Sequence, residues 1–370
     1  MIYLTAGWKL KSGEILSRQV SNDKLWSVFN YVFSGSKKRN TYKFGLIKAL
    51  LDNLFNMTLQ GEDYFISYQM IFEKFAQNYW NLVVKYHLKQ MRSDGRSEYS
   101  KVESIFRNMV NANPIIATLE FDVIGETERN RMVQEISKEC RKNVVGALYQ
   151  DTEGLLYSFD LKKGGLYISS AAYEFMLKYK EQLEKLNYYS WAKFLEQIND
   201  GNVLIGLLDK LELSTPQRTN LSVYREILKK EFEENTCFYC GSKLTKAIHV
   251  DHFIPWSYVK DDKMWNFVLS CSRCNEKKNN KIPAEKFLLK IEKRNKKAAQ
   301  IHNDLVYEDF KEYDDSRMKR LWKYAQLSGM KQFDICVDQC NEKAGVSHGK
   351  IPQSKIETPI SYEDFSRKDG

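Results

Sequence analysis

Residues 237–281 have the sequence CFYCGSKLTKAIHVDHFIPWSYVKDDKMWNFVLSCSRCNEKKNNK, and this stretch decides how the central part of the chain folds. It contains two Cys-x-x-Cys motifs, which we call the first hook (Cys237 and Cys240) and the second hook (Cys271 and Cys274). Two such hooks supply four thiolates, which is the ligand set of a closed tetrahedral zinc site. The sequence therefore predicts a structural Zn²⁺ ion bound by these four cysteines.

Short apolar runs between the hooks predict a small strand–loop–strand–helix unit. Residues 247–250 and 267–270 are expected to form the two strands, and residues 274–280 the start of the helix. A unit of this size buries too little apolar surface to fold by itself. We expect the zinc ion to supply the missing stability, because metal binding is coupled to folding in small domains.

Polar residues at the ends of these elements predict a second, open metal site. Asp251 and His252 end the first predicted strand, Asn266 precedes the second, and Asn275 follows the last cysteine. The Asp251 carboxylate and the Asn275 amide oxygen are hard ligands that suit Mg²⁺ or Mn²⁺. An imidazole accepts protons near neutral pH, so His252 is the candidate general base. Asn266 is expected to hold the loop at the His252 backbone rather than to bind the ion.

A strongly basic segment begins within the second hook. Residues 273–297 contain ten Lys or Arg and three Glu, so they carry +7 of the formal net charge of +9. A solvated helix face is one interpretation of such a run, but its position beside the open site favours contacts with a polyanion. The candidate phosphate contacts are Arg273, Lys277, Lys278, Lys281 and Lys286.

Taken together, these residues resemble the HNH endonuclease family, whose domains have the ββα-metal fold. The matching positions are Val250-Asp251-His252, Ile254-Pro255, Ser257, Asp261-Asp262, Asn266, Val268-Leu269, Asn275 and Lys278. The paired hooks resemble the zinc-stapled branch of the family, and the match is closest to the HNH domain of type II CRISPR effectors. The resemblance implies that His252 is the general base and that Asn266 orders the loop. It also implies that Asp251 and Asn275 bind one catalytic cation, with Asn275 at a position where other members have histidine.

The resemblance also implies a reaction, the hydrolysis of phosphodiester bonds. DNA is the expected substrate and RNA an alternative, and we expect a role in bacterial anti-phage defence or restriction. A different interpretation is an HNH-like subunit that binds DNA or a partner in a multi-subunit defence complex, for example with a sirtuin-like NAD hydrolase, and does not cut there. The length of the remaining chain motivates this alternative, because it exceeds what a small nuclease unit requires.

The whole sequence predicts an α+β protein that is mainly α-helical, with the zinc-stabilised ββα-metal unit embedded in it. Helices are expected over residues 41–55 and 64–88, and Pro283 is expected to open another. The helical regions are the expected surfaces for a protein partner or for homo-oligomerisation. The expected regions are a helical N-terminal domain (1–115), a mixed α/β middle region (116–230) with a hairpin near 155–169, the HNH domain with the hooks (231–300), a C-terminal helical region (301–344) and a polar tail (345–370).

The composition is that of a soluble globular protein, with 43% hydrophobic and 28% charged residues. Four of the seven cysteines lie in the hooks, which does not resemble the disulfide framework of a secreted protein. The first residues lack the apolar segment of a signal peptide, and no uncharged apolar run approaches the roughly 20 residues of a membrane span. We therefore expect a cytoplasmic protein that does not associate with membranes.

Overall fold

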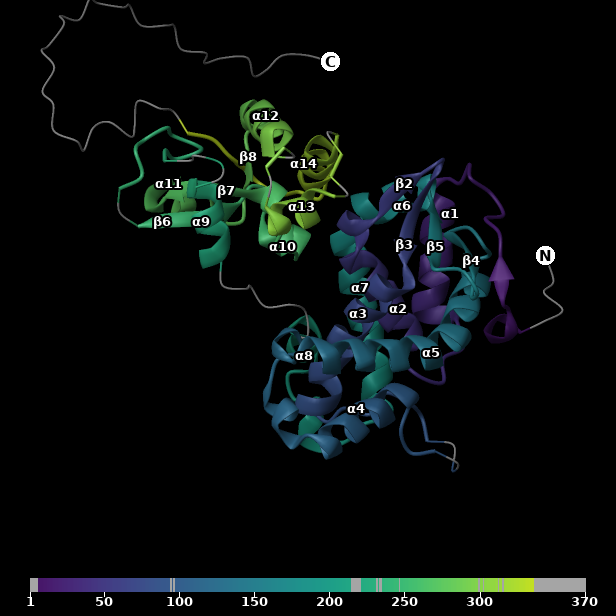
Figure 1. Cartoon of the computed structure of the whole chain (residues 1–370). Helices are drawn as coiled ribbons and strands as arrows, with labels where there is room; N and C mark the ends of the chain where they lie inside the picture. Colours follow the sequence, from purple (N-terminus) through teal and green to yellow (C-terminus); the bar gives the residue numbers. More distant parts are fainter. Residues whose placement is uncertain are drawn as a thin grey trace, which may run out of the picture.

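The computed structural model describes residues 6–93, 95, 97–213, 221–230, 232, 235–245, 247–298, 300–301, 303–311, 313–314 and 316–335. The described chain is mainly helical and forms two parts (Figure 1). We call residues 6–213 the N-terminal body and residues 221–335 the C-terminal lobe. The predicted polar tail at 345–370 lies outside the described residues.

An antiparallel five-stranded sheet runs through the N-terminal body. Its strand order is β1-β4-β5-β3-β2, with the bounds β1 Ser12–Gly13, β2 Thr58–Gln60, β3 Asp63–Ser67, β4 Tyr157–Asp160 and β5 Gly165–Ser169. The β4–β5 pair is the hairpin predicted near residues 155–169. The pairing of β3 with β5 runs from Asp63↔Ser169 to Ser67↔Gly165, so residues on both sides of position 115 build one sheet. The structure differs here from the predicted domain boundary at residue 115.

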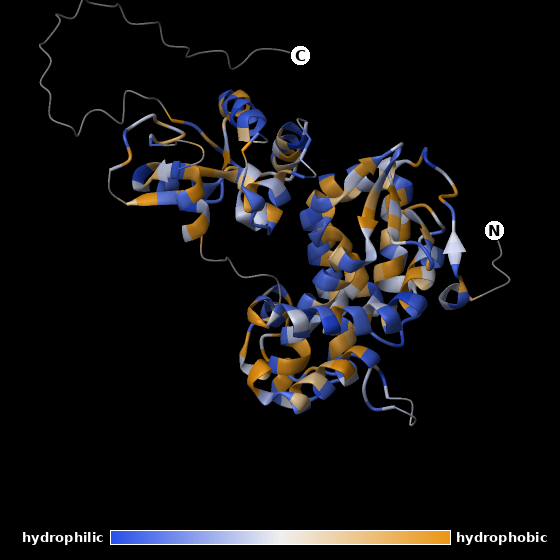
Figure 2. Cartoon of the chain, viewed as in Figure 1, coloured by the Kyte–Doolittle hydropathy of each residue, from blue (hydrophilic) through white to orange (hydrophobic). Residues whose placement is uncertain are grey.

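The N-terminal body also contains helices, of which those over residues 68–80, 126–151 and 170–178 pack against this sheet, and Figure 2 shows many apolar residues in this part of the chain. The helices are α1 Asn22–Asn30, α2 Tyr42–Asp52, α3 Tyr68–Trp80, α4 Lys101–Ala112, α5 Glu126–Asp151, α6 Ser170–Lys178, α7 Lys180–Glu196 and α8 Leu207–Leu213. The helix predicted over 41–55 corresponds to α2. The helix predicted over 64–88 starts later than expected, because the Ser67 hydroxyl accepts a hydrogen bond from the Met70 amide and caps α3. In the described part of the chain, no helix has the length and apolar character needed to span a bilayer.

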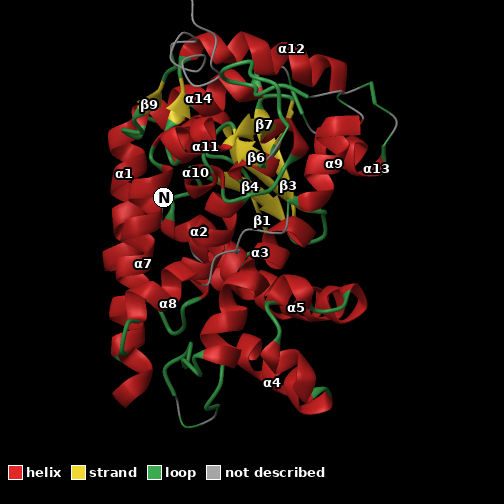
Figure 3. Cartoon of the chain, turned by 90° about the vertical axis from the view of Figure 1, so that its left-hand side faces the viewer, coloured by secondary structure: helices red, strands yellow, loops and turns green. Residues whose placement is uncertain are grey.

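The C-terminal lobe contains the predicted strand–loop–strand–helix unit. Its elements are α9 Ser222–Lys230, β6 Ile248–His252, α10 Trp256–Val259, β7 Phe267–Cys271, α11 Ser272–Lys278, β8 Ile282–Pro283, α12 Leu288–Ala298, α13 Asp304–Phe310, α14 Arg317–Leu327 and β9 Gln332–Phe333. β6 and β7 pair antiparallel, and α11 packs beside them (Figure 3). Pro283 does not open a helix, because its strand pairs in parallel with β9, and α12 begins only at Leu288.

Single helical turns connect these longer elements. They are Gly7–Lys9, Tyr31–Gly35, Leu54–Asn56, Asn81–Lys85, Pro114–Thr118, Phe121–Val123, Gly201–Leu204, Met264–Asn266 and Glu285–Phe287. The turn at Met264–Asn266 leads directly into β7, so it sets where the second strand of the lobe begins.

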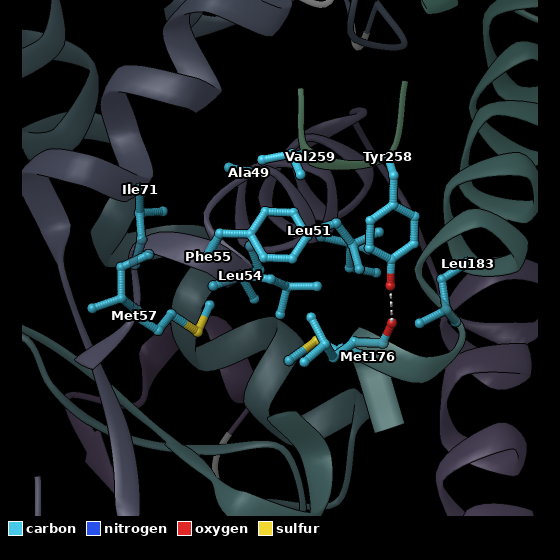
Figure 4. Packing of buried hydrophobic residues seen from close by; sticks show 14 of the residues in the cluster. Ala49, Leu51, Leu54, Phe55, Met57, Ile71, Met176, Leu183, Tyr258 and Val259 are labelled. Carbon is cyan, nitrogen blue, oxygen red and sulfur yellow. Dashed lines mark hydrogen bonds between the residues drawn. The ribbon is translucent and has the colours of Figure 1, made fainter. Parts of the chain in front are cut away.

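The lobe is anchored in the core of the N-terminal body through α10. Figure 4 shows the Tyr258 and Val259 side chains among apolar residues of the body, including Leu51 and Phe55. Tyr258 is fully buried, and its hydroxyl donates a 3.0 Å hydrogen bond to the Leu177 carbonyl. The segment that follows the first strand of the ββα unit is thus part of the core of the N-terminal body.

Candidate active site and metal centre

The four hook cysteines form one cluster. Their Sγ atoms all lie within 4.8 Å of one another, and the Cys240 and Cys271 sulfurs are 3.9 Å apart. Metal–sulfur bonds of about 2.3 Å in a tetrahedron put the sulfurs about 3.8 Å apart, so the cluster has the dimensions of a zinc site. A hydrogen bond from the Cys274 thiol lowers the pKa of Cys237 to about 4. Ligand type and spacing therefore fit a structural Zn²⁺.

Backbone contacts hold the first hook against the ββα unit. The Gly241 amide donates to the Cys237 carbonyl at 2.8 Å, and Gly241 has a φ of +73°, a conformation that favours glycine. The Phe238 amide donates to the Leu269 carbonyl of β7 at 2.9 Å, and Lys290 of α12 donates to the Phe238 carbonyl. The second hook lies where β7 ends and α11 begins. Both hooks are thus connected to β7, the first through backbone hydrogen bonds and the second through the chain itself.

A cleft of about 350 Å³ lies beside this cluster, and four of the predicted site residues line it: Asp251, His252, Asn275 and Lys278. Asp251 and His252 come from the end of β6, and Asn275 comes from α11. Trp256, beside the motif, lines the same cleft. Strand pairing fixes the two β6 residues, with Asp251 opposite Val268 and His252 opposite Phe267. Carboxylate, imidazole and amide groups therefore meet in one open, polar cavity.

Asn266 lies behind the cleft and ties down the loop after β6. Its side-chain Oδ1 accepts from the Ile254 amide at 2.8 Å, and its Nδ2 donates to the Ile254 carbonyl at 2.9 Å. Its own carbonyl accepts from the Phe253 amide at 2.7 Å. The contacts fall on the two residues after His252 rather than on the His252 backbone. Asn266 is fully buried, so it holds the loop from inside the lobe.

The His252 ring is fixed from two sides. Its Nε2 lies 2.7 Å from Asp262 Oδ1. The Phe267 ring packs against it edge to face, with ring centroids 4.7 Å apart. Asp262 belongs to the Asp-Asp pair of the sequence motif, to which we assigned no role from the sequence.

The Asp251 carboxylate has two buried donors. Tyr239 donates from its hydroxyl to Oδ2 at 2.6 Å, and Lys278 Nζ lies 3.2 Å from Oδ1 and 3.1 Å from Oδ2. Lys278 also donates to the His252 carbonyl at 2.6 Å. Burial and the negative charge of Asp251 raise the pKa of Tyr239 well above its usual value, so its hydroxyl stays a donor. The sequence reasoning missed Tyr239, although its position between the two cysteines of the first hook was a usable signal.

The position of Lys278 corrects one prediction. The sequence predicts a phosphate contact at Lys278, but its side chain is 0% exposed and pairs with Asp251 at the wall of the cleft. Lys278 lies on the inward face of α11, so its ammonium group balances Asp251 inside the lobe.

The other predicted phosphate contacts differ in exposure. Arg273 and Lys277 are exposed on α11. Lys281 is half-buried and donates to the Lys277 carbonyl at 2.9 Å. Lys286 pairs with Asp334 at 2.5 Å. Arg273, Lys277 and Lys286 are thus the exposed members of this set.

The C-terminal lobe thus combines an antiparallel strand pair, a following helix, a polar cleft and a four-cysteine cluster. Residues 237–284 match the model of a family described as HNH endonuclease. This match covers both hooks, β6, β7 and α11, and it supports the assignment of this segment to the HNH family. No curated protein and no solved structure matches the chain.

Proposed function

We propose that this protein is an HNH endonuclease that uses a divalent cation to hydrolyse phosphodiester bonds of DNA. The observation that carries the proposal is the single cleft lined by His252, Asp251 and Asn275 within the segment that matches the family. Phosphodiester hydrolysis needs a water nucleophile, a base that takes its proton and positive charge near the phosphate. The side chains around the cleft have the chemistry for these roles.

His252 is the proposed general base. Its ring takes a proton from the water that attacks phosphorus, and the bond from phosphorus to the leaving oxygen breaks. Asn266 keeps the following loop in place through the two Ile254 hydrogen bonds, so the imidazole stays at the edge of the cleft. A base held by its surroundings loses little entropy when it reacts, which favours the reaction.

Asp251 and Asn275 are the proposed ligands of the catalytic cation. Both residues line an open cleft, and Mg²⁺ prefers sites with few protein ligands and several waters. An ionised carboxylate has about four acceptor positions, so the contacts with Tyr239 and Lys278 leave Asp251 able to bind an ion. Bound Mg²⁺ or Mn²⁺ would supply positive charge to the scissile phosphate. The four cysteines would hold Zn²⁺ as a structural ion, because four thiolates leave no open coordination position.

The proposed substrate is DNA, with RNA as a tested alternative. A net charge of +9 and the exposed Arg273 and Lys277 beside the cleft support a polyanionic substrate. Lys281 and Lys286 are proposed as further phosphate contacts. The setting we propose is bacterial anti-phage defence or restriction in the cytoplasm, with the helices of the N-terminal body binding a protein partner or a second copy of the chain.

The test uses the full-length protein and a panel of nucleic acids. Supercoiled plasmid, linear duplex DNA, single-stranded DNA and RNA are each incubated with Mg²⁺, Mn²⁺ or EDTA. We expect nicking of the plasmid with Mg²⁺ or Mn²⁺ and none with EDTA. Asp251→Asn and Asn275→Ala should abolish cleavage and also weaken Mn²⁺ binding measured by electron paramagnetic resonance. Cleavage of RNA alone would change the substrate class. Failure to cut any substrate, together with copurification of a second subunit, would favour the non-cutting subunit of a complex.

A further inference from the structure

We propose that Asp262 is a positioning residue that fixes the imidazole of His252 in one tautomer, with the proton on Nε2 and the lone pair on Nδ1. The inference rests on the proposed function for the role of His252, but its structural content can be tested separately. Asp262 belongs to the sequence motif, but the proposed hydrolysis gives it no role of its own.

The contact between the two residues is short and shielded from solvent. His252 Nε2 and Asp262 Oδ1 are 2.7 Å apart, and the two side chains are 7% and 11% exposed. A hydrogen bond to an ionised group is stronger than a hydrogen bond between two neutral groups, and burial strengthens it further. The pair is therefore expected to persist in solution.

Asp262 contacts the His252 ring but does not itself line the cleft. His252 lines the cleft, whereas Asp262 is absent from the described residues that line it. Asp251 and Glu276 supply the carboxylates of that lining. The contact that connects Asp262 to the cleft is thus its bond to the His252 ring, and we infer that Asp262 influences the reaction through His252.

The loop that carries Asp262 is held in place by its neighbours. The Asp262 amide donates to Asp261 Oδ1 at 3.0 Å, and the Tyr224 hydroxyl of α9 donates to the Asp262 carbonyl at 3.4 Å. Lys260, which ends α10, has a φ of +52°, so the chain turns sharply before the two aspartates. Tyr224 also packs edge to face on Phe267, the residue that contacts the His252 ring.

The chemistry of a carboxylate decides which nitrogen carries the proton. An ionised carboxylate only accepts hydrogen bonds, so a neutral imidazole must present an N–H to it. Asp262 thus places the proton on Nε2 and leaves the lone pair of Nδ1 to accept a proton from water. After this transfer both ring nitrogens carry protons, and the carboxylate stabilises the positive ring. The partner of one ring nitrogen generally sets the state of the other.

The first test reads the tautomer directly and does not depend on cleavage. Two-bond ¹H–¹⁵N correlation spectra of ¹⁵N-histidine-labelled protein distinguish Nδ1 from Nε2, and the His252 signals are assigned by their loss in His252→Asn. We expect a proton on Nε2 in the wild type and a shift toward the Nδ1–H form in Asp262→Asn, whose amide can donate to Nε2. Asp261→Asn is the matched control and should leave the wild-type tautomer. A wild-type ring with its proton on Nδ1 would overturn the proposal.

The second test measures cleavage kinetics of the same variants. Asp262→Asn is nearly isosteric, and we expect kcat to fall by about 100-fold with KM within twofold of wild type. Asp262→Glu keeps the carboxylate and should recover part of the rate, while Asp261→Asn should cut like the wild type. An Asp262→Asn protein with full kcat would refute the positioning role. If the wild type cuts no substrate, the proposed function fails, and the tautomer measurement still decides the His252–Asp262 inference.

Discussion

Tyr239 lies between the two cysteines of the first hook and donates a 2.6 Å hydrogen bond to Asp251 Oδ2. One side chain therefore connects the four-cysteine cluster to the carboxylate proposed to bind the catalytic cation. The Tyr239 ring packs against Phe287 and Phe333, with ring centroids 5.4 and 5.3 Å away. Ring packing and the hydrogen bond to Asp251 therefore both fix the position of the Tyr239 side chain. The four-cysteine cluster is thus in a position to orient Asp251 through Tyr239, and Asn275 through its chain neighbour Cys274.

The first prediction concerns this hydroxyl. Tyr239→Phe keeps the ring but removes the donor to Asp251, so we expect cleavage to slow by about 10-fold while the zinc content stays unchanged. Tyr258→Phe is a matched control, because it removes a buried hydroxyl that bonds Leu177 in the N-terminal body. The control should lose about 1 kcal/mol of stability and keep its rate. Equal rates for Tyr239→Phe and wild type in a plasmid-nicking assay would disprove the link.

The second prediction concerns the four-cysteine cluster. Cys271→Ser removes one of four ligands, and we expect it to lose Zn²⁺ and the folded state of the lobe, because a small metal-bound unit folds only with its ion. Elemental analysis measures the zinc, and limited proteolysis followed by mass spectrometry shows whether residues 221–335 become accessible. Cys140→Ser is the control, because Cys140 is buried in the N-terminal body outside the cluster. A Cys271→Ser protein with stoichiometric zinc and a protected lobe would contradict the assignment.

The third prediction separates two neighbouring lysines of α11. Lys278→Met leaves the buried Asp251 without its charged partner, so we expect a loss of roughly 3–5 kcal/mol in the free energy of unfolding. Lys277→Met changes an exposed residue and should alter stability by less than about 0.5 kcal/mol. The logarithm of the DNA-binding constant falls linearly with the logarithm of the salt concentration. Loss of one phosphate contact should make this line less steep by about 0.9. We expect this change in DNA binding for Lys277→Met. A large loss of stability in Lys277→Met, with altered salt dependence in Lys278→Met alone, would refute the prediction.

A buried ion cluster joins the lobe to the N-terminal body. Glu184 of α7 lies 2.9 Å from Lys180 Nζ, 3.6 Å from Lys48 Nζ and 3.3 Å from Lys260 Nζ. Lys260 belongs to the lobe and the other members to the body. Burial alone would raise the pKa of Glu184, but the three ammonium groups lower it.

The fourth prediction follows from this cluster. Glu184→Gln leaves buried ammonium groups without this partner, so we expect a loss of about 3 kcal/mol at pH 7, measured by urea unfolding. A carboxyl group with a lowered folded pKa stabilises the protein above its unfolded pKa of about 4.3, and this stabilisation disappears as the pH falls through the folded pKa. The difference between wild type and variant should therefore shrink below about pH 4. Glu181→Gln, one turn earlier on α7, should unfold like the wild type, and a Glu184→Gln protein of wild-type stability would argue against the cluster.

The ββα unit could be predicted because its signals are local. The hook spacing indicates the four-cysteine cluster, and short apolar runs indicate β6 and β7. The structure confirms both strands, the helix that follows and the close approach of the four sulfurs. It also brings Asp251, His252 and Asn275 to one cleft, while their roles stay predictions.

The structure differs from the sequence-based predictions where residues far apart in the chain contact one another. Nothing near residues 63–67 indicates that they pair with residues 165–169, so the local apolar pattern predicts a helix there instead of a strand. Charge and position alone suggested a surface role for Lys278, whereas helix orientation turns it toward Asp251. The contacts of Tyr239 with Asp251 and of Asp262 with His252 span 12 and 10 positions, and they depend on how the hook and the loop fold back on β6.

The fifth prediction tests the central claim, that His252 acts as the base of a metal-dependent nuclease. The measurement is the rate of nicking of supercoiled plasmid in Mg²⁺ by the wild type and by His252→Ala, with zinc content and circular dichroism recorded for both. We predict that His252→Ala keeps the fold and the zinc and loses at least about 100-fold in rate, because general-base catalysis contributes about 10²–10⁴-fold. A folded, zinc-containing His252→Ala protein that nicks plasmid as fast as the wild type would contradict the account.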